Sequence, residues 1–555
     1  MIFNRLSVFF NKQHTISVVK KHNAISLLFT LIIALQVAVC LFWANSKTGL
    51  FIDEIHSFGL SNSEHFAFLN RDTATMNSWL DKDHFHKYLT VQNDGKFNYV
   101  NVYRNQAADV HPPLFYIALH TVCSFFPDSC SKWYGIVLNI LFFIITQIIL
   151  LKISMRMTGN NVMLSSAVLI FYGSTMLAID NVLFIRMYMM LTMFAVLTCD
   201  LHLKMFCRKV DFKNLLPVFF ITYAGCMTQY YFAIFAFFLS AVLCLCLLFE
   251  KKIKELLFYA STILLSVGCF LITYSPVFDH MFNRKVGAQN LDNALQILKI
   301  PQKCCYYAAY FGISLFSDNI IFSCAITALL FMLATVLAVM WFKRYGKDTL
   351  KTVFHSDFYF LATVVILTFV TVSLVSFDAI PRYMYFIYPL MILLVTIFFS
   401  SLFSEIFKKR SNIVSFSNRA ILAGALCLGI INLVFRKPSM LFEAEYKSIK
   451  MIETYNDRCG IFFTRNNYSG ALTQECRAVM QLKEVYCTEP ENMEKIKCLL
   501  NEKNFPPLII WVDKDNQWGS GYDPEKITAV FITNSMYTTC KKLYSYGLVD
   551  CYIVN

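Results

Sequence analysis

Charged residues are scarce in this chain of 555 amino acids: Lys, Arg, Asp and Glu together make up only 15% of it. Soluble globular proteins carry roughly 25% of these residues, so the composition excludes an ordinary water-soluble enzyme. Hydrophobic residues make up 57%, including 54 Phe and 29 Tyr, and the mean hydropathy is +0.52. A chain of this kind lies mostly in lipid.

Several other features are missing. We find no internal repeat, whereas inverted repeats with helices broken by Gly or Pro would favour a transporter. The first apolar run has no small-residue cleavage site after it, so we interpret it as an uncleaved membrane span. No Cys-x-x-Cys pair occurs among the 19 Cys, which argues against a zinc site.

Long apolar runs are what the chain has instead. A helix needs about 20 apolar residues to cross the hydrocarbon core of a bilayer. The run from Leu215 to Phe249 is too long for one helix, and we expect a hairpin broken at Thr228–Tyr231. The sequence therefore predicts eleven spans, at 24–43, 133–151, 161–179, 187–206, two within 215–249, 256–278, 320–342, 358–377, 383–403 and 420–435.

Basic residues predict the orientation, because Lys and Arg beside spans are retained in the cytoplasm. One set of connections is rich in them, and the opposite short loops hold only Arg186, Arg284, Lys285, Lys299, Lys303 and Arg382. The amino terminus is then cytoplasmic and the carboxyl terminus extracytoplasmic. The tail beyond residue 435 has 15 basic and 15 acidic residues, so the net charge of +13 belongs to the membrane half and gives no support to a nucleic-acid partner.

Two parts of the chain lie outside the predicted spans: a first loop at 44–132 and a tail at 436–555. The first loop is extracytoplasmic and belongs to the predicted membrane domain, residues 1–435. Residues 436–555 alternate short apolar runs (460–463, 508–512, 529–532) with helix-like stretches (471–482, 492–501), which favours a small α/β domain. In an oxidising compartment, disulfides are expected among the six Cys of this tail and at Cys123 and Cys130 of the first loop, with the pairing left open.

The first candidate site residues are Asp53 and Glu54, two adjacent carboxylates soon after the first span. Neighbouring side chains on a loop diverge, so one carboxylate can act as a base while the other orients an acceptor or a metal ion. The alternative interpretations are a solvated pair in a loop and charges at the N-terminus of a helix.

A second candidate is His111, which precedes Pro112-Pro113 and an apolar segment that ends near Phe126. This segment is too short to span a bilayer and suits a helix in the membrane interface. Prolines fix the first turn of such a helix and would hold the imidazole in place. The alternative is an amphipathic helix beside an incidental His.

Polar and aromatic residues recur at the extracytoplasmic ends of later spans. Two arginines at that depth would suit a phosphate group, because the guanidinium fork matches its oxygens; snorkelling to lipid headgroups is the alternative. The candidate donor-binding residues are Arg186, Tyr188, Gln229, Tyr230, Arg382 and Tyr383, together with His111.

Other polar features carry weaker signals. Asp83-His84-Phe85-His86 has residue types that bind divalent metals, but its spacing is generic and favours an exposed polar loop. We expect Asp180 and Asp378 to be local ion partners of the two arginines. Asn467-Tyr468-Ser469 matches the glycosylation sequon.

In this order, the motifs resemble the GT-C class of polytopic glycosyltransferases, specifically the protein O-mannosyltransferase and aminoarabinose transferase group (glycosyltransferase family 39-like). The resemblance rests on Asp53-Glu54, the HPPLFY segment from His111, Arg186-Met187-Tyr188 and Arg382-Tyr383, and covers roughly residues 20–435. It implies a polytopic α-helical membrane protein with a GT-C-like fold, and the sequence pattern of residues 436–555 adds the small outward-facing C-terminal α/β domain.

The resemblance also implies an activity. Such enzymes move a sugar from a polyprenyl-phosphate donor to a lipid, glycan or protein acceptor on the extracytoplasmic face of the cell membrane. By position, Asp53 would activate the acceptor, and Arg186 and Arg382 would hold the lipid phosphate. No cofactor is certain, and a divalent metal ion is a further candidate. A lipid-linked sugar flippase and a non-catalytic anchor with an outward binding domain are the alternatives.

Overall fold

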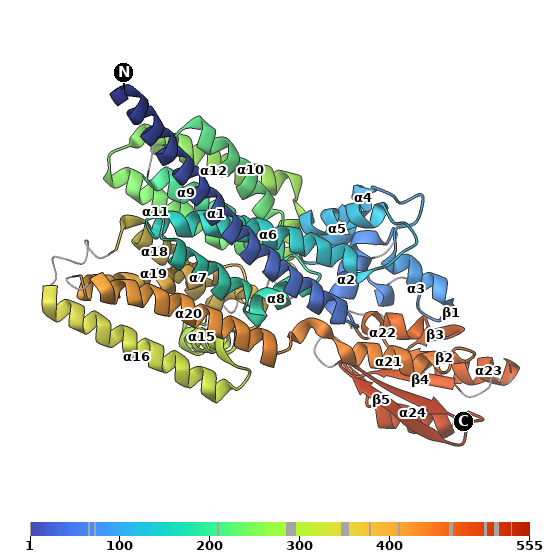
Figure 1. Cartoon of the computed structure of the whole chain (residues 1–555). Coiled ribbons are helices and arrows are strands. Elements are labelled where there is room, and N and C mark those ends of the chain that lie inside the picture. Colours follow the sequence, from blue (N-terminus) through green and yellow to red (C-terminus); the bar gives the residue numbers. More distant parts are fainter. Residues whose placement is uncertain are drawn as a thin grey trace.

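The computed structural model describes residues 2–64, 67–71, 74–207, 210–284, 296–345, 354–376, 379–408, 411–465, 470–503, 508–515, 521–533 and 535–555. Long helices form a bundle, and the first loop and the C-terminal sheet lie together at one end of it (Figure 1). We call this the tail end of the bundle.

The bundle agrees with most of the predicted spans. Nine helices among the described residues are long and apolar enough to cross a membrane. They are α1 (Ile2–Ser46), α6 (Lys132–Met157), α9 (Tyr188–Cys207), α11 (Tyr231–Phe249), α12 (Ile253–Thr273), α16 (Ile320–Tyr345), α18 (Ser356–Val375), α19 (Tyr388–Ile406) and α20 (Ser411–Phe435).

The two remaining predicted spans differ from simple helices. The span at 161–179 is a pair, α7 (Val162–Gly173) and α8 (Met176–Leu183), bent by 55°. The hairpin within 215–249 breaks at the predicted place, but α10 (Phe212–Cys226) has only 15 residues. The described chain therefore has nine or ten spans by length, where the sequence predicted eleven.

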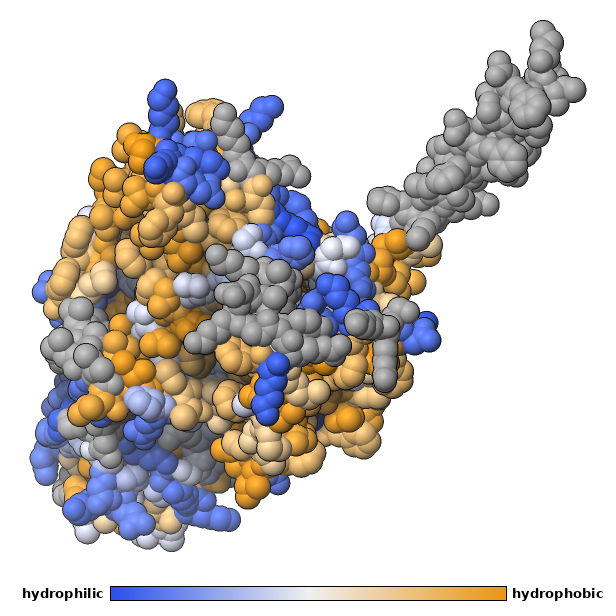
Figure 2. All heavy atoms as spheres, turned by 90° about the vertical axis from the view of Figure 1, so that its left-hand side faces the viewer, coloured by the Kyte–Doolittle hydropathy of each residue, from blue (hydrophilic) through white to orange (hydrophobic). Residues whose placement is uncertain are grey.

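The outside of the bundle is apolar. Leu264, Ile272 and Phe331 are examples of large hydrophobic side chains that are exposed on it. Figure 2 shows hydrophobic residues over much of the face that is turned to the viewer. Exposed apolar surface of this extent is unfavourable in water and is expected in lipid, so the chain is a multi-pass membrane protein.

The first loop is built mainly of short helices. They are α2 (Ile52–Asn62), η1 (Leu69–Arg71), α3 (Lys82–Leu89), α4 (Tyr99–Ala108) and α5 (Leu114–Ser124), with one strand, β1 (Ser78–Asp81). As predicted, a short apolar helix follows Pro112-Pro113. In α2 the Glu54 carboxylate accepts a hydrogen bond from the Phe51 N–H (2.7 Å), which caps the first turn. That turn carries Asp53.

A second group of short elements lies between the later spans: α13 (Pro276–Phe282), η2 (Ile297–Lys299), α15 (Ile300–Phe316) and η4 (Pro381–Met384). Lys299 and Lys303 were predicted to lie in a short loop between spans, but residues 300–316 form a helix. Lys303 on α15 donates to the Ser376 carbonyl oxygen (2.8 Å), just past the end of α18. A cation is stabilised at a helix C-terminus, so the charge of Lys303 is compatible with a packed helix.

The tail forms a mixed sheet with helices. Its elements are η5 (Ser439–Leu441), α21 (Glu443–Glu453), β2 (Cys459–Phe463), α22 (Ala471–Val479), β3 (Glu484–Thr488), η6 (Pro490–Asn492), α23 (Met493–Lys503), β4 (Leu508–Asp513), α24 (Pro524–Thr533), β5 (Cys540–Tyr546) and β6 (Val549–Val554). The strand order is β1-β3-β2-β4-β6-β5, and β2 pairs in parallel with β3 and β4.

The sheet differs from the sequence analysis in two respects. The apolar run at 529–532 lies in helix α24, where Phe531 faces the core while Val530 is exposed. Strand β1 comes from the first loop and pairs antiparallel with β3, with Trp79 opposite Tyr486. The sheet therefore crosses the predicted domain boundary at residue 435.

The expected disulfides are not formed, and this prediction was wrong. Cys123, Cys130 and the six Cys of the tail are free thiols. Cys476, Cys487 and Cys551 are fully buried in the core. They act there as small apolar side chains.

Candidate active site

Asp53 lies where three parts of the chain meet at the tail end of the bundle. Its Oδ2 is 2.9 Å from a terminal nitrogen of Arg382, which comes from η4. Arg186, between α8 and α9, donates to the carbonyl oxygen of Asp53 (3.3 Å). Residues more than 300 positions apart in the sequence thus form one charged cluster.

The two guanidinium groups keep Asp53 ionised. Burial by itself would raise the pKa of Asp53, but Arg382 and Arg186 oppose it and hold the pKa below its ordinary value. His56, one turn further along α2, is neutral near pH 7, because burial lowers its pKa to about 4. The cluster thus combines one carboxylate with two permanent cations.

His111 joins the cluster through Arg186. Its Nε2 is 3.4 Å from a terminal nitrogen of Arg186, and its Nδ1 is 2.7 Å from a carboxylate oxygen of Asp109. Arginine only donates, so Nε2 accepts and the Nδ1–H donates to Asp109. The sequence analysis missed Asp109, although its spacing from His111 is a usable signal. Burial would raise the pKa of Asp109, but His111 and Arg186 lower it.

Glu54 points away from this cluster. Its carboxylate is fully buried, pairs with Lys47 (3.0 Å) and also accepts from the backbone N–H of Ile185 (2.9 Å). The adjacent carboxylates therefore diverge, although they lie in the first turn of helix α2 and not on the expected loop. Glu54 joins α2 to the end of α1 and to the residue before Arg186. A catalytic role for Glu54 stays a prediction.

Both arginines have spare donors. Arg186 is only 4% exposed and lies over the ring of Tyr116, 5.8 Å from its centroid. The Nε atoms of Arg186 and Arg382 are buried without a hydrogen-bond partner among the described residues. An unsatisfied buried donor is costly, so each of these two N–H groups suits an anionic ligand.

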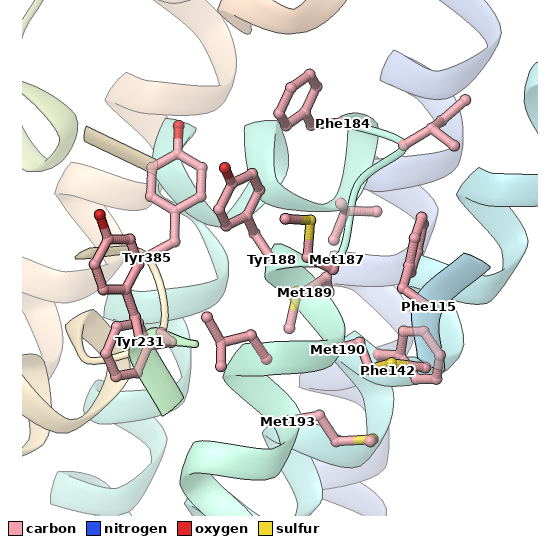
Figure 3. Close-up of a cluster of buried hydrophobic side chains, with 14 of the residues drawn as sticks. Phe115, Phe142, Phe184, Met187, Tyr188, Met189, Met190, Met193, Tyr231 and Tyr385 are labelled. Carbon is pink, nitrogen blue, oxygen red and sulfur yellow. The ribbon is translucent and has the colours of Figure 1, made fainter. Parts of the chain in front are cut away.

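Two aromatic rings lie close to the Arg382 guanidinium group. Its guanidinium lies over the rings of Phe184 (5.6 Å) and Tyr188 (6.0 Å). Figure 3 shows Tyr188, Tyr231 and Tyr385 near one another, with their hydroxyl groups pointing the same way. Tyr383 packs against Tyr231, with 5.1 Å between ring centroids. Tyr188 and Tyr383 thus lie beside the cluster.

Gln229 and Tyr230 take a different place. The hydroxyl of Tyr230 is 2.7 Å from Nδ1 of His280 on α13, and Gln229 accepts weakly from the backbone of Tyr231 (3.4 Å). The turn between α10 and α11 therefore packs against α13. A role for these two residues in donor binding stays a prediction.

The histidines of the Asp83–His86 segment contact threonine side chains. His84 bonds to Thr75 (2.9 Å) and His86 lies 3.4 Å from Thr90. In the part of the chain that the structure describes, no group of three or more His, Cys, Asp or Glu side chains could hold a metal ion. Metal dependence stays a prediction.

Asp180 was expected to pair with an arginine but accepts hydrogen bonds from the Ser439 hydroxyl (2.7 Å) and from the Met440 N–H (3.1 Å). Asp378 and the sequon at 467–469 lie outside the described residues.

An apolar groove of about 920 Å³ opens between α15, α16, α18, α19 and α20. Phe311 lines it and stacks on Tyr388, with 4.8 Å between ring centroids. Tyr388 neighbours Tyr385 (6.4 Å), and Tyr385 neighbours Tyr188 (6.3 Å), beside Arg382. A continuous series of rings thus links the groove with the charged cluster.

Comparison with known proteins identifies the fold. No family model and no curated protein matches the chain. ArnT from Cupriavidus metallidurans bound to undecaprenyl phosphate superposes over 94% of this chain and 97% of that chain, with 9% identity and a TM-score of 0.53. ArnT from the same organism in the apo state superposes over 96% of this chain and 98% of that chain, with 8% identity and a TM-score of 0.52. The predicted GT-C-like polytopic fold is confirmed.

Proposed function

We propose that this protein is a membrane glycosyltransferase that moves a sugar from a polyprenyl-phosphate donor to an acceptor on the extracytoplasmic face. The observation that carries the proposal is the cluster of Asp53 with Arg186 and Arg382, in which Arg382 pairs with the Asp53 carboxylate and the buried Arg186 donates to the Asp53 backbone carbonyl oxygen. The shared fold with ArnT, whose solved structure contains undecaprenyl phosphate, supports the same class of donor.

The cluster suits the charges of this reaction. An acceptor oxygen forms a bond to the anomeric carbon, the bond from that carbon to the phosphate oxygen breaks, and the acceptor proton passes to Asp53. Positive charge builds up on the sugar and negative charge on the leaving phosphate. Arg186 and Arg382 stabilise that phosphate through donors that are already in place.

In this proposal, binding of the donor phosphate also releases the Asp53 carboxylate from Arg382. Asp53 and Arg382 are close, but their alignment does not make a hydrogen bond. A phosphate with bidentate geometry competes well for such a guanidinium. Once Arg382 turns to the phosphate, Asp53 is available to accept a proton from the acceptor.

The apolar groove is the proposed site for the polyprenyl chain. It is lined by side chains such as Phe311, Leu330, Val365 and Ile392, and the series of rings connects it to Arg382. A lipid tail in this groove would place its phosphate near the two arginines. The donor then needs no nucleotide-binding loop, because it dissolves in the bilayer.

The membrane orientation is part of the proposal. Lys152 on α6 and Lys204 on α9, which belong to connections predicted to be cytoplasmic, both pair with Asp200 near the ends of these helices that are far from the cluster. The cluster, the first loop and the sheet would therefore face outward, with the amino terminus inside. Reaction of engineered cysteines with an impermeant thiol reagent in intact cells checks this directly.

A transfer assay tests the function. Purified protein in liposomes is given a radiolabelled polyprenyl-phosphate sugar together with candidate lipid, glycan and protein acceptors. We expect label to become covalently attached to one acceptor class. Label that only changes leaflet would indicate a flippase, and label that stays on the donor without relocation would indicate an anchor.

A further inference from the structure

The segment just before Asp53 is held by the tail. The Gly49 N–H donates to the Leu441 carbonyl oxygen (3.1 Å), and Lys47 Nζ donates to the Met440 carbonyl oxygen (2.5 Å). Both acceptors lie in η5, which joins the last span to the sheet. Residues 47–49 thus meet a part of the chain almost 400 positions later.

The packing at this contact is close. A Cβ atom on Gly49 would lie 1.8 Å from the carbonyl oxygen of Phe442, so only glycine fits there. Phe442 has a left-handed backbone (φ 49°) and stacks on Phe51, with 5.0 Å between ring centroids. Lys47 Nζ lies 4.5 Å from the centroid of the Phe442 ring. A strained non-glycine residue in a close contact indicates a fixed geometry.

A buried carboxylate continues the contact. Glu445 on α21 is 2% exposed and accepts from the backbone N–H of Leu50 (3.2 Å). Arg477 on α22 donates to both of its oxygens, at 3.1 and 3.0 Å. Leu50 precedes Asp53 by three residues, so Glu445 fixes the backbone that leads into the first turn of α2.

The tail also holds the chain beyond α2. Strand β1 pairs with β3 over four residues, with Ser78 opposite Cys487 and Asp81 opposite Glu484. Ile52 at the start of α2 packs against Gly470 at the start of α22, where an added Cβ would lie 2.3 Å from the Ile52 side chain. The helix that carries Asp53 is therefore attached to the tail on both sides.

A further series of contacts links the tail with Ile185, the residue before Arg186. Lys47, which the tail holds through Met440, pairs with Glu54, and Glu54 accepts from the N–H of Ile185. The Lys47 and Glu54 side chains are fully buried, so water does not compete for their ion pair. The position of Asp53 and that of Arg186 depend on one set of contacts.

We infer that residues 439–445 together with Arg477, which we name the tail clamp, position Asp53 and Arg186 for the reaction, and that Glu445 is a positioning residue of the active site. The inference rests on the proposed function. It assigns the tail a part in the chemical step, separate from any acceptor that the tail recognises.

The test compares three variants of the full-length protein in liposomes. Glu445→Leu removes the hydrogen bond from Leu50 and the two from Arg477, and Glu445→Gln keeps an acceptor for Leu50 while weakening the ion pair with Arg477. Glu491→Leu is the matched control, because Glu491 forms an ion pair of similar length with Arg465 (2.9 Å) elsewhere in the tail. For each variant, kcat, donor KM and amide hydrogen exchange in residues 47–62 are measured.

We expect Glu445→Leu to lower kcat about tenfold or more, since small misplacements of reacting groups are costly, with donor KM within about twofold of the wild type. Exchange in residues 47–62 should become faster in this variant alone. Glu445→Gln should lie between it and the wild type, and this variant decides the question if Glu445→Leu does not fold.

Unchanged kcat together with unchanged exchange would overturn the tail clamp, and so would a rise in donor KM at normal kcat. A wild-type protein that transfers no sugar would overturn the proposed function instead. The exchange measurement still tests the clamp in that case.

Discussion

Arg382 and Asp53 form an ion pair with 2.9 Å between the guanidinium nitrogen and Oδ2, but without the alignment of a hydrogen bond. The pair is electrostatic and only partly buried, with about one fifth of each side chain exposed. It joins the first loop to the segment before α19. A ligand with better hydrogen-bond geometry can therefore take Arg382 from Asp53, and this exchange underlies the proposed reaction.

The first prediction concerns pH. Arg382 is the strongest influence that lowers the pKa of Asp53, so its removal in Arg382→Gln should raise that pKa and move the acid limb of kcat/KM to higher pH. Arg458→Gln, which removes an arginine paired with Asp457 in the tail, should leave the limb in place. Acid limbs that coincide in Arg382→Gln and the wild type would contradict the ion pair.

The lowered pKa of Asp53 also makes the stability of the fold depend on pH. A carboxylate whose pKa is lowered in the folded state contributes stability above its unfolded pKa, and this contribution is lost as the pH falls through the folded value. The loss should occur at higher pH in Arg382→Gln. Thermal melting across the acid range would show it.

The second prediction concerns the groove. Gly424 lines it, and a Cβ atom there would meet no atom within 4 Å, so Gly424→Leu should fill part of the groove without a clash. Lipid is as apolar as the groove, so the polyprenyl chain gains packing contacts there and no hydrophobic free energy. Gly424→Leu removes some of these packing contacts. We expect KM for a long-chain donor to rise about threefold to tenfold, and KM for a short-chain donor to stay constant.

Gly268→Leu on α12 is the matched control, because Gly268 also has open space around it and does not line the groove. Equal effects on long-chain and short-chain donors in Gly424→Leu would place the polyprenyl chain elsewhere.

The third prediction concerns Lys47, which is fully buried against Glu54. Lys47→Met leaves the Glu54 carboxylate buried without its cation, which typically costs about 3–5 kcal/mol. We expect a clear fall in the melting temperature, and partial recovery in the double variant Lys47→Met/Glu54→Leu. Lys450→Met, which breaks an exposed pair with Glu453, should melt like the wild type.

The fourth prediction concerns Gly49. Gly49→Ala places a Cβ against the Phe442 carbonyl oxygen and should destabilise the protein by about 1–3 kcal/mol, as overpacking does. Gly268→Ala, in a helix with open space, should be neutral or stabilise by up to about 1 kcal/mol. Equal melting temperatures for the two variants would show that the tail moves away from Gly49 at little cost.

Much of the bundle could be predicted from sequence, because spans are set by the thickness of the bilayer and leave long apolar runs. The same regularity indicated that Asp53, His111, Arg186 and Arg382 lie at one end of it. Which carboxylate faces the arginines was not predictable, because Glu54 turns to Lys47 and Ile185, and that choice depends on packing.

The parts contributed by the tail were harder to predict. Strand β1 has only four residues, and its partner β3 lies about 400 positions away, so no local pattern announces the pairing. The run at 529–532 has too few apolar residues to distinguish a strand from one face of a helix. Glu445 has no motif around it, and only the fold brings it to Leu50.

The most direct test is sugar transfer by Asp53→Asn, which keeps the shape of the side chain but removes the charge that accepts the proton. With a radiolabelled polyprenyl-phosphate sugar and normal amounts of protein in the membrane, we predict that transfer is abolished while the donor still binds. Transfer at a near-normal rate would remove Asp53 from the mechanism and contradict the account.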